Sequence, residues 1–321
     1  MSVRIKNIGI IGVGGVGGYF GGKLCSLKNT GDFRVSFIAR GAHLRAIQES
    51  GLLLNSENEG DMVCKPSLAT DDFNQLPPLD LCLICVKAFD LAPVLPRLAP
   101  HIGDETFVVP LMNGIDIDSR IRKVIKNGIL FPACISLGTK IQNPGRVLQR
   151  GGDCYVLSGP DPLNPGIKPD EIVRVFEAAK LEFRWTPGIQ SEIWKKFIFI
   201  SGYALVSAAF NKTLGEILED AETRKTTEKI ISEAISIAKG LGVSLPADIA
   251  PKSLLRAHAF PPETQTSFQR DFERSDKMDE RDLYAGSMIR LAHDLGIEIP
   301  ETKKFFEVLE QRKPWRWGTP N

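Results

Sequence analysis

A glycine-rich run near the start of the chain, Gly12-Val13-Gly14-Gly15-Val16-Gly17-Gly18, has the spacing G-x-G-x-x-G. It follows the apolar run Ile8–Ile11 and precedes Tyr19–Leu27, a segment that can form a helix. This order of strand, glycine turn and helix suits the pyrophosphate of a dinucleotide, which must approach bare backbone at a helix N-terminus. The sequence therefore predicts a dinucleotide site, with a purely structural glycine turn as the alternative.

Each glycine of the motif has its own expected task. Gly12 permits the tight turn, Gly14 leaves room for the phosphates, and Gly17 lets helix and strand pack closely. The intervening Gly15 and Val16 are expected to line the same cofactor site.

Lys196 could act as a proton donor. It directly precedes the apolar stretch Phe197–Phe210, and on a helix it would share a face with Ile200 and Tyr203. Hydride transfer to a ketone builds negative charge on the oxygen. An ammonium beside that oxygen stabilises the charge and can supply the proton. The alternative is that Lys195 and Lys196 form a solvated pair at a helix end, since most lysines are exposed.

Acidic residues gather before the last part of the chain, at Asp276, Asp279, Glu280 and Asp282. Taken alone, they indicate the start of a helix, with Asp276 as the N-cap and the others favouring the helix dipole. A little earlier, Ser267 could bond a substrate carboxylate, although a plain surface serine fits the composition nearly as well.

The second predicted strand, Val35–Ala39, ends in Arg40-Gly41. NAD-specific sites usually end this strand with Asp or Glu, which bonds the ribose hydroxyls. A guanidinium can instead form a fork with a 2′-phosphate, so Arg40 predicts NADP. The alternative is a surface arginine that opens the next helix.

Two further polar positions follow predicted strands at the ligand-binding edge of a parallel sheet. Lys87 follows Leu79–Val86 and could add a second positive charge near the phosphates. Asn113-Gly114 follows Thr106–Leu111, although Asn-Gly is also a plain turn signal.

The chain of 321 residues is long enough for two domains, and 43% apolar with 25% charged residues is ordinary for a globular protein. A net charge of +1 gives no electrostatic reason to expect a nucleic acid or an anionic membrane as a partner. No secretory or transit segment is visible, and Phe197–Asn211 is shorter than the roughly 20 residues that cross a bilayer. The cytoplasm is the expected compartment, and the apolar helices could bury a homodimer interface as easily as a core.

The six cysteines include the C-x-x-C spacing Cys82-Leu-Ile-Cys85. This pair lies in an apolar run, where residues three apart on a strand face opposite sides. We therefore expect buried small side chains, not a redox or zinc site, and the four scattered histidines give no metal-ligand spacing.

Strand and helix patterns alternate through the first half of the chain. The predicted strands are Ile5–Ile11, Val35–Ala39, Leu79–Val86, Thr106–Leu111 and Ile129–Cys134, and the predicted helices between them are Tyr19–Leu27, His43–Glu49, Leu91–Leu98 and Ile117–Ile125. This alternation predicts an α/β, Rossmann-like domain with a mostly parallel, doubly wound sheet. The β-rich stretch Leu137–Leu157, with Asn143-Pro144-Gly145 as its turn, could be a hairpin at the sheet edge.

The second half is predicted to be helical. Asp161–Pro169 is expected to be a loop and about Asp170–Lys180 a helix, after which Thr186-Pro187-Gly188 breaks the pattern. We therefore expect a dinucleotide-binding domain over 1–186 and an all-α substrate domain over 187–321. The helical patterns of the second domain cover Gln190–Asn211, Leu214–Leu241 and Met278–Leu295.

Together these features resemble the ketopantoate reductases, or 2-dehydropantoate 2-reductases, over nearly the whole chain. The resemblance lies in the order of Gly12-x-Gly14-Gly15-x-Gly17-Gly18, Ile38-Ala39-Arg40-Gly41-x-His43-Leu44, Val86-Lys87, Asn113-Gly114, Trp194-x-Lys196, Leu214-Gly215-Glu216, Ser267-x-x-x-Asp271 and Glu280-x-Asp282-x-x-x-Gly286. It implies an N-terminal Rossmann domain, a helical C-terminal domain and NADPH-dependent reduction of ketopantoate to pantoate, on the route to pantothenate.

The resemblance also implies roles for individual residues. Lys196 matches the catalytic lysine of the family, and Glu280 its substrate-binding glutamate, with Asp279 as the competing choice. Ser267 matches a serine that contacts the substrate. Asn113 matches an asparagine near the nicotinamide and substrate, and Arg40 and Lys87 match the basic residues on the 2′-phosphate side.

The chain departs from the family at Ile200, Ala204 and Leu214, where many members carry asparagines. Because those asparagines help to hold the polar groups of the substrate, a reductase of a different 2-keto acid is the first alternative. A non-catalytic NADPH-binding sensor is the second, although the retention of Lys196 and Glu280 disfavours it.

Overall fold

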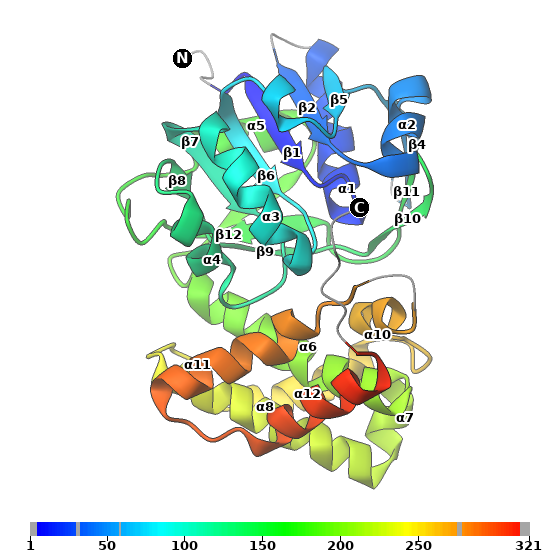
Figure 1. Ribbon diagram of the computed structural model, residues 1–321, viewed down its shortest axis with the longest axis vertical. Helices are drawn as coiled ribbons and strands as arrows, with labels where there is room; N and C mark the ends of the chain where they lie inside the picture. Colours follow the sequence, from blue (N-terminus) through cyan, green and yellow to red (C-terminus); the bar gives the residue numbers. More distant parts are fainter. Residues whose placement is uncertain (1–4, 30–32, 58, 275–277, 315–321) are drawn as a thin grey trace. The chain divides into compact units, whose positions relative to one another are not determined.

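The computed structural model describes residues 5–29, 33–57, 59–274 and 278–314. The chain divides into two compact units (Figure 1). Unit 1 comprises Met1–Met112 and Ile117–Ile189, and unit 2 comprises Asn113–Asp116 and Gln190–Asn321. The α/β class with a parallel sheet in the first half and helices in the second is confirmed.

Unit 1 is built on a six-stranded parallel sheet with the order β5-β2-β1-β6-β7-β8. Its strands are β1 (Asn7–Ile11), β2 (Arg34–Ile38), β5 (Leu68–Thr70), β6 (Leu79–Ile84), β7 (Ile102–Pro110) and β8 (Ile129–Leu130). The central strands β1 and β6 are almost entirely buried, which explains their unbroken apolar runs.

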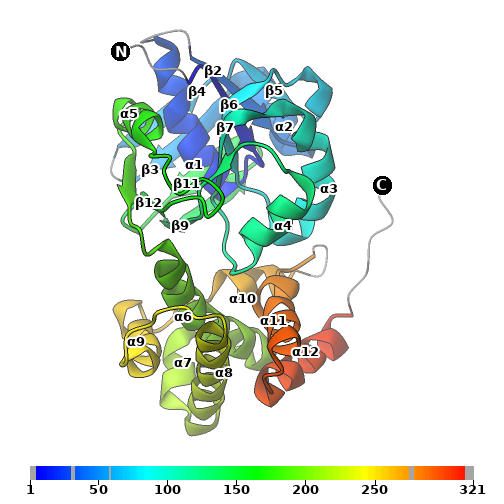
Figure 2. The same cartoon turned by 90° about the vertical axis from the view of Figure 1, so that its left-hand side faces the viewer.

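The helices of unit 1 are α1 (Gly15–Leu24), α2 (Gly41–Ser50), α3 (Ala88–Leu98), α4 (Ile117–Val124) and α5 (Asp170–Ala178). The chain steps from β1 to β2 in one direction and from β6 to β7 in the other. Right-handed crossovers therefore put α1 and α3 on opposite faces, and Figure 2 shows α3 and α4 on one side of the sheet with α5 on the other. The strand order reverses between β1 and β6, and open parallel sheets bind ligands at that position.

Two smaller sheets complete unit 1. One has the order β10-β11-β3-β4, formed by β3 (Leu52–Ser56), β4 (Gly60–Cys64), β10 (Thr139–Asn143) and β11 (Arg146–Gln149). The other has the order β13-β12-β9, formed by β9 (Ala133–Ser136), β12 (Tyr155–Ser158) and β13 (Glu182–Trp185). Four strands were not predicted from the sequence: β3, β4 and β13 in these smaller sheets, and β5 in the main sheet.

The predicted hairpin within 137–157 exists, but its placement at the edge of the main sheet is wrong. Its second strand, β11, pairs with β3 in a separate sheet that packs against α1. The predicted strand Ile129–Cys134 is also divided, since β8 ends at Leu130 in the main sheet and β9 begins at Ala133 in another. Pro132 separates them, and a proline cannot donate to a strand ladder.

Unit 2 is helical. It contains α6 (Ile189–Phe210), α7 (Leu214–Glu219), α8 (Ala221–Gly240), α9 (Ile249–Leu255), α10 (Ser267–Phe272), the π-helical turn η5 (Asp282–Gly286), α11 (Ser287–Leu295) and α12 (Pro300–Arg312). A short 3₁₀ turn occupies Arg256–Ala259 in this unit, and three others occupy Cys25–Asn29, Phe73–Gln75 and Ala99–His101 in unit 1. Helix α6 is long and apolar enough to cross a membrane, but 72% of its most apolar window is buried inside the fold, as in a core helix.

Two predicted helices of unit 2 have different bounds in the structure. Leu214–Leu241 is broken at Asp220, whose backbone is extended and whose carboxylate accepts the Glu222 and Thr223 N–H groups that open α8. The predicted helix Met278–Leu295 starts later. Asp279 accepts the backbone N–H of Arg281, as a capping residue does, whereas Asp276 lies outside the described residues.

Candidate active site

The glycine turn joins the carboxyl end of β1 to the first turn of α1. Gly12 has a φ of +95°, and a Cβ there would lie 2.7 Å from Val86 Cγ1. A Cβ on Gly17 would lie 2.2 Å from the Gly12 carbonyl oxygen, so helix and turn touch directly. By contrast, a Cβ on Gly14 would meet nothing within 4 Å. The turn is therefore tightly packed at Gly12 and Gly17, whereas the space next to Gly14 is open. Phosphates that bind at a helix N-terminus require such open space.

The neighbouring residues of the turn face the small sheet. A Cβ on Gly15 would lie 2.7 Å from Thr139 Oγ1 at the start of β10, and Val16 is half-buried. A Cβ on Gly18 would lie 2.6 Å from Val147 Cγ2 in β11. Glycine at these positions thus lets the β10–β11 hairpin lie directly on α1.

Positive charge follows β2 and β6, the strands on either side of β1. Arg40 lies between β2 and α2 with 76% of its side chain exposed, and Lys87 lies between β6 and α3 and is exposed. The Arg40 guanidinium forms a bidentate pair with Asp90 in the first turn of α3, with Nη1–Oδ1 and Nη2–Oδ2 distances of 3.1 and 2.8 Å. No sequence pattern pointed to Asp90 as a partner of Arg40.

His43 fixes the first turn of α2. Its Nδ1 accepts the backbone N–H of Gly145, in the β10–β11 turn, at 3.0 Å. Burial lowers the pKa of His43, and this outweighs a backbone contact with Val13 of the glycine turn that acts in the opposite direction. The neutral imidazole thus ties α2 to the hairpin that covers α1.

Lys196 lies about two turns inside α6, not at the helix end that the alternative interpretation assumed. It is half-buried next to Phe197, which is 3% exposed. The adjacent Lys195 is also half-buried, and its ammonium forms an ion pair with Glu192 at 2.6 Å. Both lysines therefore lie inside the helix and are partly buried, unlike a solvated pair at a helix end.

Tyr284 links the segments that carry the candidate residues of unit 2. Its buried ring stacks on Phe197, with centroids 6.3 Å apart, and meets the edge of Phe268 at 5.5 Å. Its hydroxyl accepts the Asn113 amide Nδ2–H at 3.4 Å. Phe197 follows Lys196, Phe268 follows Ser267, and Tyr284 comes four residues after Glu280. One aromatic residue thus gathers the segments bearing all four of these candidates.

The loop that carries Asn113 has a second attachment in unit 2. Arg290 of α11 pairs with Asp282 at 2.5 Å and with Asp116 at 3.2 Å. Burial alone would lower the pKa of Arg290, but its two acidic partners raise it. Asn113 is therefore held beside Tyr284 by an ion pair as well as by its own hydrogen bond.

Ser267 is the exposed first residue of α10. Thr266 caps this helix by accepting the Gln269 N–H, and its hydroxyl lies 2.8 Å from Ser207 Oγ in α6. The hydroxyl contact sets the start of α10 against α6, the helix that also carries Lys196.

The structure separates the two acids that competed for the family's glutamate position. Asp279 is 1% exposed, and its two carboxylate oxygens accept Arg281 Nε–H at 2.8 Å and Nη2–H at 2.7 Å. Burial alone would lower the pKa of Arg281, but Asp279 and Glu310 raise it. Asp279 is therefore engaged by Arg281, and Glu280 remains the candidate for substrate contact. It is 7% exposed and directly precedes the turn leading into the π-helix, a feature often found at functional sites.

The positions where many family members carry asparagine are apolar here and well packed. Ala204 and Leu214 are buried, and Ile200 is half-buried on α6, one turn beyond Lys196. These side chains offer no hydrogen bonds to a substrate.

Within the described part of the chain, no group of three or more His, Cys, Asp or Glu residues is placed to bind a metal ion. Cys82 and Cys85 are free thiols in or next to β6, and burial raises the pKa of both. A protonated thiol is a poor nucleophile and a poor metal ligand.

Residues 8–160 match the family described as "Ketopantoate reductase PanE/ApbA", and residues 188–313 match "Ketopantoate reductase PanE/ApbA C terminal". The 2-dehydropantoate 2-reductase of Mesorhizobium japonicum is 28% identical over 312 residues, covering 90% of this chain and 91% of the relative. The uncharacterized oxidoreductase YkpB of Bacillus subtilis is 24% identical over 302 residues, covering 94% and 97%.

Solved structures with the same fold include members of this family. A PanE/ApbA family ketopantoate reductase from Ralstonia eutropha superimposes with a TM-score of 0.85 at 24% identity, covering 95% of this chain and 98% of that structure. The chain therefore belongs to the ketopantoate reductase family, whose members are NAD(P)-dependent oxidoreductases that act on CH–OH groups.

Proposed function

We propose that this chain reduces a 2-keto acid to a 2-hydroxy acid with NADPH, and that ketopantoate is its substrate, on the cytoplasmic route to pantothenate. The observation that carries the proposal is the convergence on Tyr284 of the segments bearing Lys196, Ser267, Glu280 and Asn113. The name of the Mesorhizobium japonicum relative, a 2-dehydropantoate 2-reductase, supports the choice of substrate.

The residues of unit 1 fit a phosphorylated nicotinamide dinucleotide. The open space above Gly14 suits the pyrophosphate at the N-terminus of α1. Arg40 and Lys87 would hold the 2′-phosphate, since both are exposed cations that follow the carboxyl ends of β2 and β6, on either side of β1. When bound, the reduced nicotinamide supplies the hydride.

Lys196 acts as the general acid in this proposal. The ketone carbon gains the hydride, the C=O π bond breaks, and negative charge forms on the oxygen. The Lys196 ammonium stabilises this charge and donates a proton to the oxygen, which completes the hydroxyl group. The half-buried setting beside Phe197 favours this, because charge interactions are stronger where water is partly excluded.

The other candidates bind and orient the substrate. Glu280 accepts a hydrogen bond from a substrate hydroxyl or orients Lys196, and Ser267 donates its hydroxyl to the substrate carboxylate. Asn113, held by its bond to Tyr284, presents its amide to the nicotinamide and substrate.

A second candidate is the same reaction on a different 2-keto acid. It is favoured by Ile200, Ala204 and Leu214, because apolar side chains there cannot bond the polar groups that asparagines would hold. A substrate with a more apolar side chain suits such a surface better, since unpaired buried polar groups are costly.

The test follows NADPH absorbance with purified protein and a panel of 2-keto acids, including ketopantoate and analogues with apolar side chains. Highest kcat/KM for ketopantoate supports the first candidate, and highest kcat/KM for an apolar analogue supports the second. Tight NADPH binding with no oxidation by any keto acid would overturn both and indicate a sensor.

A further inference from the structure

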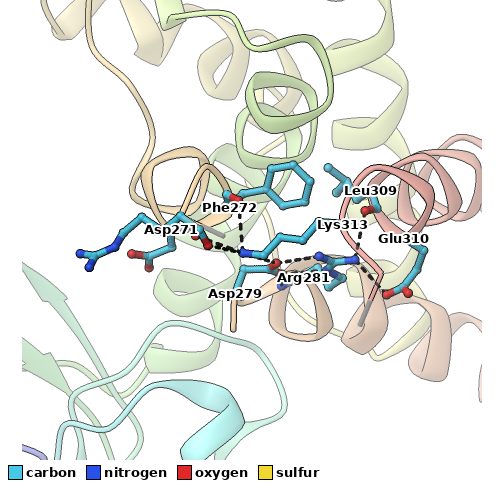
Figure 3. Close-up of polar contacts among 8 residues, drawn as sticks. Asp271, Phe272, Asp279, Arg281, Leu309, Glu310 and Lys313 are labelled. Carbon is cyan, nitrogen blue, oxygen red and sulfur yellow. Dashed lines mark hydrogen bonds and ion pairs between the residues drawn. The ribbon is translucent and has the colours of Figure 1, made fainter. Parts of the chain in front are cut away.

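The last turn of α12 contacts the C-terminal ends of two other helices. Arg312 Nη1 donates to the Ala208 carbonyl at 2.7 Å and to the Ala209 carbonyl, both at the end of α6. Lys313 Nζ donates to two carbonyls at the end of α10, those of Asp271 at 3.4 Å and Phe272 at 3.2 Å (Figure 3), and to the Arg274 carbonyl just beyond the helix at 2.8 Å. Cations suit these positions because helix C-termini carry unsatisfied carbonyls and partial negative charge.

The same turn of α12 holds the two residues on either side of Glu280. Arg281 Nη1 donates to the Leu309 carbonyl at 3.1 Å and to Glu310 Oε1 at 3.0 Å, while its other nitrogens bind Asp279 (Figure 3). Lys313 Nζ also lies 3.5 Å from Asp279 Oδ2. Both members of the buried Asp279–Arg281 pair therefore contact the end of α12: Arg281 binds Leu309 and Glu310, and Asp279 lies beside Lys313.

Such a buried pair is poorly explained by stability alone. Asp279 and Arg281 are each 1% exposed, and the cost of removing two charges from water offsets much of their attraction. The pair does fix the orientation of this segment, because a bidentate guanidinium sets both the distance and the plane of the carboxylate that it binds.

We infer that the end of α12, together with Lys313 and the bound Arg281, positions the active-site residues of unit 2. We call this set of contacts the clamp, and Arg281 and Lys313 are its positioning residues. The clamp fixes Glu280 through its neighbours Asp279 and Arg281, and it anchors α10, which begins with Ser267. This inference rests on the proposed function, in which Glu280 and Ser267 contact the substrate.

The first test replaces Lys313 without leaving a carboxylate buried alone. We expect Lys313→Met to lower kcat/KM for the best keto acid by about tenfold or more, because small displacements of substrate-contacting groups are costly. The Kd for NADPH should stay within about twofold of wild type, since the glycine turn, Arg40 and Lys87, which would hold the phosphates of the cofactor, lie in unit 1. Lys313→Arg should restore most of the loss, and Lys303→Met, which removes an exposed lysine of the same helix, is the matched control.

A second measurement does not depend on turnover. Amide hydrogen exchange in peptides covering residues 278–284 should be about tenfold faster in Lys313→Met than in wild type, with residues of α8 unchanged. Glu310→Gln, which weakens the hold on Arg281 from the partly exposed side, should give a smaller effect in the same direction.

The results separate the clamp from the proposed function. If wild-type protein reduces no keto acid, the proposed function fails, and the exchange measurement still decides whether the clamp exists. The clamp is overturned if Lys313→Met keeps wild-type kcat/KM and wild-type exchange at 278–284. It is equally overturned if only the Tm falls while kcat/KM, measured well below the Tm, does not change.

Discussion

Arg40 and Asp90 face each other across the loops that follow β2 and β6, joined by two nearly parallel hydrogen bonds of 3.1 and 2.8 Å. The guanidinium proposed to bind a 2′-phosphate is therefore already engaged by a carboxylate. A phosphate must compete with Asp90 for the same fork and is also repelled by its charge.

We expect Asp90→Asn to tighten NADPH binding by about fivefold to tenfold and to change NADH binding much less, because only NADPH carries the competing phosphate. Fluorescence titration with both nucleotides measures the ratio of the two Kd values. Asp90→Glu, which keeps the charge, is the control. A ratio that does not change would mean that Asp90 has no influence on cofactor choice.

Arg40→Glu should weaken NADPH binding by about a hundredfold, since a cation is replaced by an anion beside the phosphate, while NADH loses far less. The same titration gives both values. Equal weakening of the two nucleotides would contradict a role for Arg40 at the 2′-phosphate.

Lys196→Ala should lower kcat by about a hundredfold or more, the scale expected for loss of a general acid, while NADPH still binds. Steady-state kinetics and nucleotide titration of the same preparation check the two parts. The matched control is Lys195→Ala, because Lys195 is the adjacent lysine and pairs with Glu192 at the surface. Near-normal turnover of Lys196→Ala would remove this residue from the mechanism.

Two glycine variants separate a structural role from phosphate contact. Gly17→Ala places a methyl group against the Gly12 carbonyl, with a Cβ–O distance of 2.2 Å, so both the Tm and NADPH affinity should fall. Gly14→Ala meets nothing within 4 Å, so its Tm should stay near wild type while NADPH affinity falls, because the methyl group occupies phosphate space. Thermal melts with and without NADPH distinguish the two. Wild-type affinity in Gly14→Ala would place the phosphates elsewhere.

His43 predicts a dependence of stability on pH. Its pKa in the folded protein lies below the ordinary value of 6.5, so the native state favours the neutral ring. Its contribution to stability is therefore fully present above about pH 6.5 and is lost as the pH falls through the lowered pKa. In urea unfolding experiments, the free energy of unfolding should fall less for His43→Asn than for wild type as the pH is lowered from about 7.5 to 5. His293→Asn, which alters a histidine 87% exposed, should keep the wild-type slope.

Much of unit 1 was predictable because its order is local. The glycine turn lies directly between a buried strand and its helix, so neighbouring residues specify both elements. The small sheet was missed for the opposite reason. β3 forms a hairpin with the neighbouring β4, but its other partner, β11, lies far along the chain, and no pattern near Leu52–Ser56 indicates that second pairing.

The candidate site shows the same limit. The types and order of Lys196 and Glu280 could be read from the sequence, but the residues that hold them could not. Arg281 stands among charged residues, which are seldom buried, yet it is 1% exposed because Asp279 and α12 surround it. Asp90 looks like an ordinary first-turn acid of α3, and only the tertiary structure brings it to Arg40.

The pairing of β3 with β11 has a consequence for how the protein folds. Ser56 and Gln149, which are joined by a buried side-chain hydrogen bond, are separated by 93 positions. Pairings between such distant segments form slowly, because a long loop must close before any contact rewards it. Until Val147 emerges from the ribosome, the face of α1 at Gly18 lacks its nearest neighbouring side chain and can be covered only in part, by Leu52 of β3. During synthesis the nascent N-terminal half therefore exposes part of the apolar surface of α1 and the edge of β3 that later pairs with β11. Exposed apolar surface and unpaired strand edges promote aggregation, so the risk of aggregation is highest in this interval.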